Sequence, residues 1–220
     1  MSNAQPVAMD ASDSADLRGD SRVVRMRRAE ARGAQPQAYP GLRAMVRSDV
    51  QVWGEQLAGR KPGASVSLKT AIRMVLVYAG LRTALLHRLA FAADRAGVKI
   101  VPLILTNLNL SLHGFDMPAH IEVGPRFFVP HPVGTVVTAQ RIGAGATLVS
   151  AITIGMRNGS DFPILGDDVY VGAGARILGE VTIGDRAQIG ANAVVLKDVP
   201  ADHVAIGVPA RIRPAGVRGE

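Results

Sequence analysis

The chain has 220 residues and a formal net charge of +7, which is enough length for one domain with a substantial core. It contains no cysteine, which excludes disulfide bonds and thiolate metal sites and fits a cytoplasmic location. Only 4% of the residues are aromatic, so stacking platforms for single-stranded nucleic acid are not evident and no nucleic-acid partner is expected.

Residues 1–40 are rich in Ala, Ser, Asp, Arg, Gln and Pro and show no sustained hydrophobic periodicity. They are predicted to form a disordered basic tail, whose arginines are Arg18, Arg22, Arg25, Arg27, Arg28 and Arg32. The first twenty residues lack the apolar stretch of a secretory signal. We interpret the tail as a solvated leader rather than as an anchor for anionic surfaces.

Residues 41–114 are predicted to form an α-helical module, because their apolar residues recur at helical spacing. One helix is expected over residues 42–57 and a second over 67–96, with Gly80 as the point where it bends. A third is expected to start near Pro102 and to end at Gly114. Its apolar face would consist of Leu105, Leu108 and Leu112. Ordinary packing explains such faces best, and a peripheral membrane role is a further possibility.

Between Leu165 and Val195 an aliphatic residue recurs at every sixth position, which matches neither the helical period of 3.6 nor the alternation of a plain strand. The aliphatic positions are Leu165, Val171, Ile177, Ile183, Ile189 and Val195. A small or β-branched residue follows four positions later, at Val169, Ala175, Val181, Ala187, Ala193 and Val199. The period predicts a hexapeptide parallel β-helix with three hexads in each coil.

The repeat extends toward the N-terminus in two offset sets. The first set is Met117, Val123 and Val129, and the second is Val136, Ile142, Leu148 and Ile154. The spacing fails after Ile154, so residues 155–163 are predicted to form a loop outside the coil. The β-helix is assigned to residues 115–214, with a short tail at 215–220. Because the end coils need covers, we expect the helical module at one end and residues 199–214 at the other.

One histidine and one aspartate in the repeat region are candidates for chemistry. His131 lies in a Val-Pro-His-Pro segment where the hexad period slips, and Asp116 precedes it by fifteen residues, slightly less than one coil. A carboxylate beside an imidazole suits general-base removal of a hydroxyl proton. The spacing alone equally allows a histidine that only fills a corner. No His/Asp/Glu cluster has metal-ligand spacing, so no metal is expected.

Residues 117–213 resemble the catalytic domain of bacterial serine acetyltransferases, which belong to the left-handed β-helix hexapeptide acyltransferases. The matching segments are 115–116, 122–128, 131–137, 151–155, 171–179, 189–200 and the Gly-Val-Pro-Ala-Arg-Ile ending at 207–212. The Asp116…His131 spacing matches the family's catalytic pair and is the most specific of these features. The resemblance implies a mainly β protein, a left-handed parallel β-helix with an N-terminal α-helical module.

The resemblance also implies an activity and its residues. His131 would take the proton of an acceptor hydroxyl as it attacks acetyl-CoA, the co-substrate, and Asp116 would orient His131. The residues matched to coenzyme A binding are Gly155, Ala173, Gly174, Lys197 and Arg211. For Lys197 and Arg211, ordinary solvated charge is an equally good interpretation. The family implies a homotrimer or a dimer of trimers, with the site between subunits.

The sequence departs from the family at the positions that hold the acceptor and beside the catalytic histidine. Pro130 stands where the family has an acidic residue, and Asp161 and Phe162 stand where it has Arg-His. Met156 replaces a glycine and Gln188 a lysine. Losing a guanidinium that pairs with a carboxylate should weaken the binding of free serine, and Arg157 is a candidate replacement.

The acceptor is therefore left open between serine, a sugar and a cell-surface polysaccharide. A non-catalytic hexapeptide scaffold is a further alternative, because the fold alone does not settle function.

Overall fold

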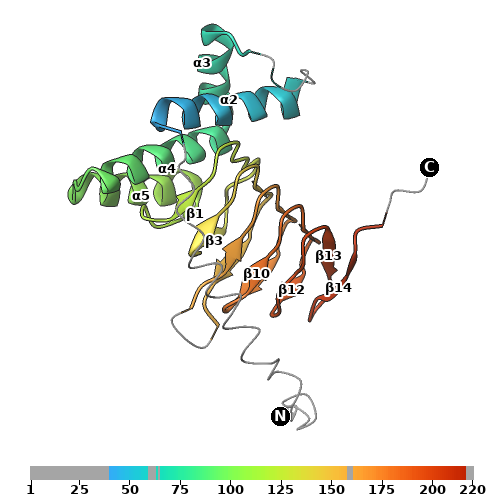
Figure 1. The fold of residues 1–220 in the computed structure, drawn as a ribbon. Helices are drawn as coiled ribbons and strands as arrows, with labels where there is room; N and C mark the ends of the chain where they lie inside the picture. The colour runs from blue at the N-terminus through green and yellow to red at the C-terminus, as the bar shows by residue number, and fades with distance from the viewer. Residues whose placement is uncertain (1–39, 59–62, 64, 158–160, 217–220) are drawn as a thin grey trace, which may run out of the picture. The chain divides into compact units, whose positions relative to one another are not determined.

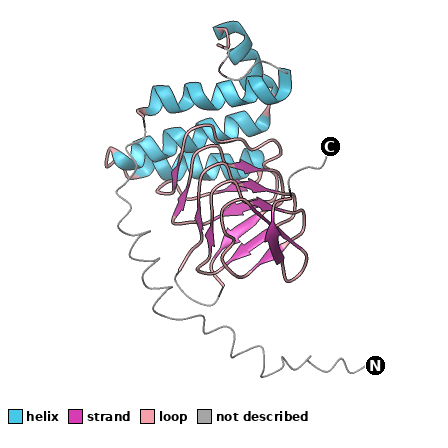
Figure 2. Ribbon diagram, turned by 45° about the vertical axis from the view of Figure 1, so that its right-hand side comes forward, coloured by secondary structure: helices cyan, strands magenta, loops and turns pink. Residues whose placement is uncertain are grey.

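The computed structural model describes residues 40–58, 63, 65–157 and 161–216 (Figure 1). Residues 1–39 of the predicted tail, 158–160 of the predicted loop and 217–220 lie outside the described residues. Within the described part, α-helices lead into a stack of short strands (Figure 2). The predicted fold class, a parallel β-helix preceded by a helical module, is confirmed.

The helices are α2 (Leu42–Ala58), α3 (Leu68–Val77), α4 (Ala79–Arg95) and α5 (Ile100–His113). The long predicted second helix is in fact two helices, α3 and α4, bent by 102°. The bend lies at Tyr78, whose backbone is extended, and the prediction of a bend at Gly80 is wrong. Gly80 serves close packing instead, because a Cβ there would overlap the carbonyl oxygen of Val129.

Helix α5 begins at Ile100, slightly before the predicted start, and ends as predicted at Gly114, which has φ +62°. Its orientation differs from the prediction. Leu108 and Leu112 are 40% and 65% exposed, whereas Asn109 and His113 are buried. Hydrogen bonds explain the reversal, because these two polar side chains bind each other and helix α4, as described below.

No single described helix is long and apolar enough to cross a bilayer. Helices α3 and α4 together reach the length and apolar composition of a membrane-spanning segment, but they are separated by a bend.

Three sheets form the sides of the coil, and all their strands run parallel except the last, β14. Sheet A holds β1 (Phe115–Asp116), β3 (Thr135–Val137), β6 (Thr153–Gly155), β9 (Arg176–Leu178) and β12 (Val194–Val195). Sheet B holds β2 (Glu122–Val123), β4 (Arg141–Ile142), β7 (Ile164–Leu165) and β10 (Thr182–Ile183). Sheet C holds β5 (Thr147–Leu148), β8 (Tyr170–Val171), β11 (Gln188–Ile189), β13 (His203–Ile206) and β14 (Arg211–Pro214). Successive strands pass from sheet to sheet, as the period of six predicts.

The coil length follows from the register. Leu165 pairs with Ile183, Val171 with Ile189 and Ile177 with Val195, each eighteen residues further on. Three hexads therefore complete one coil, and each aliphatic residue lies directly over the equivalent residue of the next coil. The inward aliphatic residues from Ile142 to Ile189 are fully buried: Ile142, Leu148, Ile154, Leu165, Val171, Ile177, Ile183 and Ile189.

The predicted inward position of Val136 is wrong. Val137 points inward and pairs with Ile154, whereas Val136 is 42% exposed and Thr135 is buried. The segment from Val129 to Val137 is two residues longer than a hexad, because an extended corner around Pro132 precedes β3. The inward row therefore resumes at Val137, one residue after the predicted Val136, and the next step, to Ile142, is five residues instead of six.

A buried ion pair joins the helical module to the first coil. Arg88 of α4 pairs with Asp49 of α2 at 2.9 Å and also donates to the carbonyl oxygens of Val123 and Gly124. The carboxylate of Asp49 in turn accepts from the backbone N–H of Phe127 at 2.9 Å. Burial raises the pKa of Asp49, and the contacts with Arg88 and Phe127 oppose that rise.

A buried histidine lies at the same junction. His87 of α4 is hydrogen-bonded through Nε2 to the carbonyl oxygen of Ile121, at 3.0 Å. Burial, with smaller contributions from the charges of Arg88 and His120, lowers the pKa of His87 to about 3. The ring is therefore neutral at neutral pH, and its Nε2 donates to the carbonyl.

The other end of the β-helix is covered by its last two strands. β13 runs parallel to β11, whereas β14 turns back antiparallel to β13 and pairs with it from His203 to Ile206. Ala210 and Ile212 pack against the core from this hairpin. Residues 199–214 thus close the stack, as predicted.

Candidate active site

The predicted site residues lie at the two edges of sheet A. At one edge, where the chain passes from sheet C to sheet A, successive corners stack directly on one another. The backbone N–H of Ala151 donates to Val133 O at 3.2 Å, that of Gly174 to Ser150 O at 2.9 Å and that of Asn192 to Ala173 O at 2.8 Å. We call this row of corners, which begins with His131, the His131 edge.

Small residues and left-handed turns define the corners of the His131 edge. Ala151, Gly174 and Asn192 all have positive φ, and a Cβ on Gly174 would overlap the side-chain oxygen of Asn192. Arg176 holds two of these corners, because its guanidinium donates to Ala151 O at 2.6 Å and to Gly174 O at 2.9 Å. The edge is therefore rigid and narrow, with little side-chain bulk projecting from it.

His131 lies at the first level of this edge, with its side chain exposed. Its backbone N–H donates to Val149 O at 3.1 Å, which fixes the corner on the coil below. Asp116 is half-buried on β1 and pairs with Val136 of the neighbouring strand β3. The two residues thus occupy adjacent levels, as the spacing predicts, although among the described residues no hydrogen bond joins their side chains.

The opposite edge of sheet A, where the chain passes from sheet A to sheet B, carries the loop residues. Gly155 ends β6 there, and its carbonyl accepts from the backbone N–H of Gly179 at 2.9 Å. A cavity of about 230 Å³ opens at this edge. Its lining includes Arg157, Asp161, Leu178, Gly179, Glu180 and Leu196. We call this the loop edge.

Two further predicted residues lie at the loop edge. The carbonyl oxygen of Phe162 accepts from the side-chain amide of Gln140 at 2.9 Å, which holds the end of the loop against the neighbouring coil. Lys197 follows β12 and is exposed.

The structure therefore divides the predicted site residues into two groups. His131, Ala173 and Gly174 share the His131 edge, whereas Gly155, Lys197 and the predicted acceptor residues share the loop edge. Ala151 and Gly155 mark the two edges on one strand and are four residues apart, which is about 13 Å at the rise of an extended strand. Within one subunit the two groups are not brought together.

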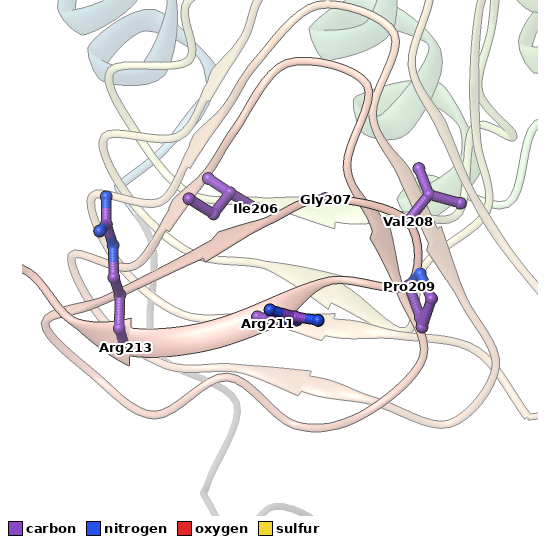
Figure 3. Close-up of a pocket in the computed structure, with 6 residues that line it drawn as sticks. All are labelled: Ile206, Gly207, Val208, Pro209, Arg211 and Arg213. Atoms are coloured by element: carbon purple, nitrogen blue, oxygen red, sulfur yellow. The ribbon is translucent and has the colours of Figure 1, made fainter.

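Arg211 lies at the far end of the molecule from His131, beside a cavity of about 520 Å³ (Figure 3). The cavity is lined by Ile206, Gly207, Val208, Pro209, Arg211 and Arg213. The carbonyl of Gly207 accepts from the backbone N–H of Val194, which places this corner at the last level of the His131 edge. Neither arginine forms an ion pair with any residue in the described part of the chain.

Arg213 is a candidate that the sequence analysis missed. The signal was present, because residues two apart on a strand point to the same side, and Arg211 and Arg213 both belong to β14. Two guanidinium groups at the mouth of one cavity suit a ligand with phosphate groups.

The chain is similar to proteins of one kind in three comparisons. The family described as bacterial transferase hexapeptide (six repeats) matches residues 162–197. A serine acetyltransferase of Mycobacterium tuberculosis (strain H37Rv) is 35% identical over 148 residues, which are 65% of this chain and 64% of the relative. A serine acetyltransferase of Helicobacter pylori (strain J99) is 34% identical over 142 residues, 63% of this chain and 83% of the relative.

The chain belongs to the serine acetyltransferase family. Solved structures agree: soybean serine acetyltransferase complexed with serine matches with a TM-score of 0.69 and 29% identity, over 79% of this chain and 70% of that one. A serine acetyltransferase in complex with CoA matches with a TM-score of 0.67 and 26% identity, over 78% and 69%. The chain spans somewhat less than two thirds of the M. tuberculosis family member's length.

Proposed function

We propose that this protein transfers an acetyl group from acetyl-CoA to a hydroxyl group. One observation carries the proposal: His131 lies at one end of an edge whose other end, at Gly207, is flanked by Arg211, and Arg213 lines the same cavity two residues further along β14. Four coil spacings of about 4.8 Å separate these ends, about 19 Å in all. An extended coenzyme A fits this arrangement, with its phosphates at the arginines and its thioester near His131.

The corners between these ends would accommodate the pantetheine arm. Most of the corner residues are small, namely Ala151, Ala173–Gly174 and Ala191, so little side-chain bulk would oppose the arm there. Holding the thioester beside a base contributes to the rate mainly by positioning.

The chemistry follows from the side chain at the start of the edge. The neutral imidazole of His131 takes the proton of the acceptor hydroxyl, whose oxygen attacks the thioester carbonyl carbon. Backbone N–H groups would stabilise the negative oxygen of the tetrahedral intermediate. The carbon–sulfur bond then breaks, and the imidazolium returns the proton to the thiolate. Asp116 would orient His131 and stabilise its charged form.

A homotrimer is part of the proposal. The two groups of site residues lie on opposite edges of sheet A, so they meet only if the loop edge of one subunit faces the His131 edge of another. A three-fold arrangement repeats this contact at each interface and closes. A cytoplasmic location stays a prediction.

Serine is the first acceptor to test, because the relatives are named for it. Asp161 favours a second candidate. It lines the cavity at the loop edge where the resemblance implies an arginine, so the guanidinium expected to pair with the carboxylate of a free amino acid is missing at this position. A neutral hydroxyl acceptor such as a saccharide does not need this guanidinium.

The test is release of free thiol from acetyl-CoA, measured with L-serine and with a panel of saccharides. Turnover with either acceptor should fall at least about a hundredfold in His131→Ala, the usual effect of removing a general base. Arg186→Gln, at an exposed corner between sheets B and C and therefore away from both edges of sheet A, is the control and should retain activity. Absence of acetyl-CoA binding together with absence of turnover would favour the scaffold alternative, and full turnover in His131→Ala would reject the assigned base.

A further inference from the structure

The exposed apolar side chains of the molecule are concentrated in the helical module. Of the twenty-one large hydrophobic residues that are exposed in the described structure, fifteen lie between Leu42 and Leu112. Most of them form two sets, one on α3 and one on α5. We define the apolar surface as Leu68, Ile72 and Leu76 of α3 together with Ile100, Leu103, Ile104, Leu108 and Leu112 of α5. Single exposed hydrophobic residues are ordinary, whereas a set of this size marks a binding surface.

Hydrogen bonds hold α5 in this orientation. His113 Nδ1 lies 3.1 Å from the side-chain oxygen of Asn109, and the amide nitrogen of Asn109 donates to Thr83 O of α4 at 3.1 Å. Arg82 Nε donates to His113 Nε2 at 3.2 Å. The polar side of α5 is therefore fixed toward α4, and its apolar side cannot turn inward without breaking buried hydrogen bonds.

The same arginine brings the two sets together. While Nε of Arg82 contacts the last residue of α5, its Nη1 donates to the carbonyl oxygens of Val75 and Leu76 at the end of α3, both at 2.9 Å. The C-terminal ends of the two helices thus meet at one guanidinium group. The exposed residues at these two ends, Leu76 of α3 and Leu112 of α5, therefore lie in the same part of the module.

Positive charge is concentrated in the same module. Residues 41–114 contain ten lysines and arginines against three aspartates and glutamates, whereas the remainder of the chain has fifteen of each. Two of the three acidic groups are neutralised, because Asp49 pairs with Arg88 and Glu55 pairs with Arg126. The whole net charge of the protein therefore belongs to the region that exposes the apolar surface.

Several of these cations border the apolar surface. Lys69 and Arg73 follow Leu68 and Ile72 directly on α3, and both are exposed. Arg95 ends α4 and Lys99 immediately precedes α5, again with exposed side chains. Apolar residues flanked by lysine and arginine are the pattern of helices that lie in the interface of a membrane with anionic lipids.

We propose that the helical module binds the surface of a bilayer that contains anionic lipids, through the apolar surface on α3 and α5. Helix α5 is about 21 Å long at 1.5 Å per residue, too short to cross the hydrocarbon core, so it lies along the interface. A second copy of the chain bound through the same surface is a poorer occupant, because this two-fold contact would oppose the same cationic residues. The lipid headgroups instead supply the opposite charge.

The experiment is co-sedimentation of the full chain with vesicles. Phosphatidylcholine vesicles that also contain phosphatidylglycerol are compared with vesicles of phosphatidylcholine alone, at low salt and at about 0.5 M salt, where charges are screened within a few ångströms. Ile72→Asp and Ile104→Asp place a charge on each half of the surface, at positions 54% and 58% exposed. Tyr170→Asp adds the same charge on the β-helix, at a position 45% exposed, and is the matched control.

The wild-type chain and Tyr170→Asp should pellet with the anionic vesicles, and binding should fall in high salt and on neutral vesicles. Each aspartate on the apolar surface should lower the partition coefficient at least about tenfold, which corresponds to about 1.4 kcal/mol. The proposal is overturned if the wild-type chain stays in the supernatant, or if both variants pellet as the control does. Light scattering supplies the other decisive outcome: an oligomer that dissociates in Ile104→Asp assigns the surface to a contact between copies.

Discussion

The β-helix and the helical module solve the same problem, burying apolar residues, in opposite ways. In the β-helix every coil repeats one local rule, and the inward aliphatic residues are fully buried from Ile142 to Ile189. In the module, Asn109 and His113 lie inside while Leu108 and Leu112 of the same helix face outward. In a repeated unit the stacking of coils fixes whether each side chain points inward or outward. In a single helix, a few buried hydrogen bonds can decide which face points toward the core.

The largest effect is expected where the two regions join. Arg88→Ala should lower the free energy of unfolding by about 3–5 kcal/mol, because it leaves the carboxylate of Asp49 buried without its partner. Chemical denaturation measures the change. Arg186→Ala removes a fully exposed pair with Asp202 and should leave stability unchanged. Equal losses in the two variants would show that the buried pair does not hold the junction.

The next largest effect compares the interiors of the two regions. Ile177→Ala should lower the free energy of unfolding by about 2–5 kcal/mol, because the stack cannot collapse around the missing side chain. Leu108→Ala, on the exposed side of α5, should change it by less than about 0.5 kcal/mol. Thermal and denaturant unfolding of both variants tests the contrast. A large loss in Leu108→Ala would mean that its side chain is covered in the assembled protein.

These contrasts explain which features the sequence could predict. The hexad period determines both pairing and burial, so the coil of eighteen residues and the inward row could be read directly. The shift of the inward position from Val136 to Val137 could not be predicted, because the extra length of the corner at Pro132 does not alter the local secondary-structure propensity. The bend at Tyr78 and the reversal of α5 also escaped prediction, since both depend on contacts between residues far apart in sequence, such as Gly80 with Val129 and Asn109 with Thr83.

The candidate site shows the same division. The spacing of Asp116 and His131 predicted that they lie on adjacent coils, because residues about one coil length apart in sequence occupy neighbouring levels of the stack. It could not predict that Gly155 and Lys197 lie on the opposite edge from Gly174, since that requires knowing which corner each residue occupies. The alternation of side chains along β14 would have placed Arg213 on the same side as Arg211. Its importance as a candidate ligand-binding residue follows only from the cavity at Gly207, which the sequence does not reveal.

A pH-dependent effect is expected at the junction, because burial holds the pKa of His87 at about 3, below its ordinary 6.5. A lowered histidine pKa favours the neutral ring in the folded state. Its contribution is therefore complete above pH 6.5 and is lost as the pH falls toward 3. Between pH 8 and pH 5 the loss should be about 2 kcal/mol, at about 1.4 kcal/mol for each unit below 6.5. His87→Gln can still donate to Ile121 O and should lose this part of the pH dependence, as denaturation at both pH values would show.

The smallest expected effect on stability concerns the apolar surface itself. Leu112→Ser exchanges a side chain that is 65% exposed at the end of α5, so the free energy of unfolding should change by less than about 0.5 kcal/mol. Asn109→Leu, one turn earlier on the buried side, should cost about 1–3 kcal/mol, because it leaves Thr83 O and His113 without their partner. Denaturation of the two variants measures whether α5 is held by its polar side. If Leu112→Ser is the more destabilising, the leucines rather than the hydrogen bonds fix this helix, and the contrast between the two regions is lost.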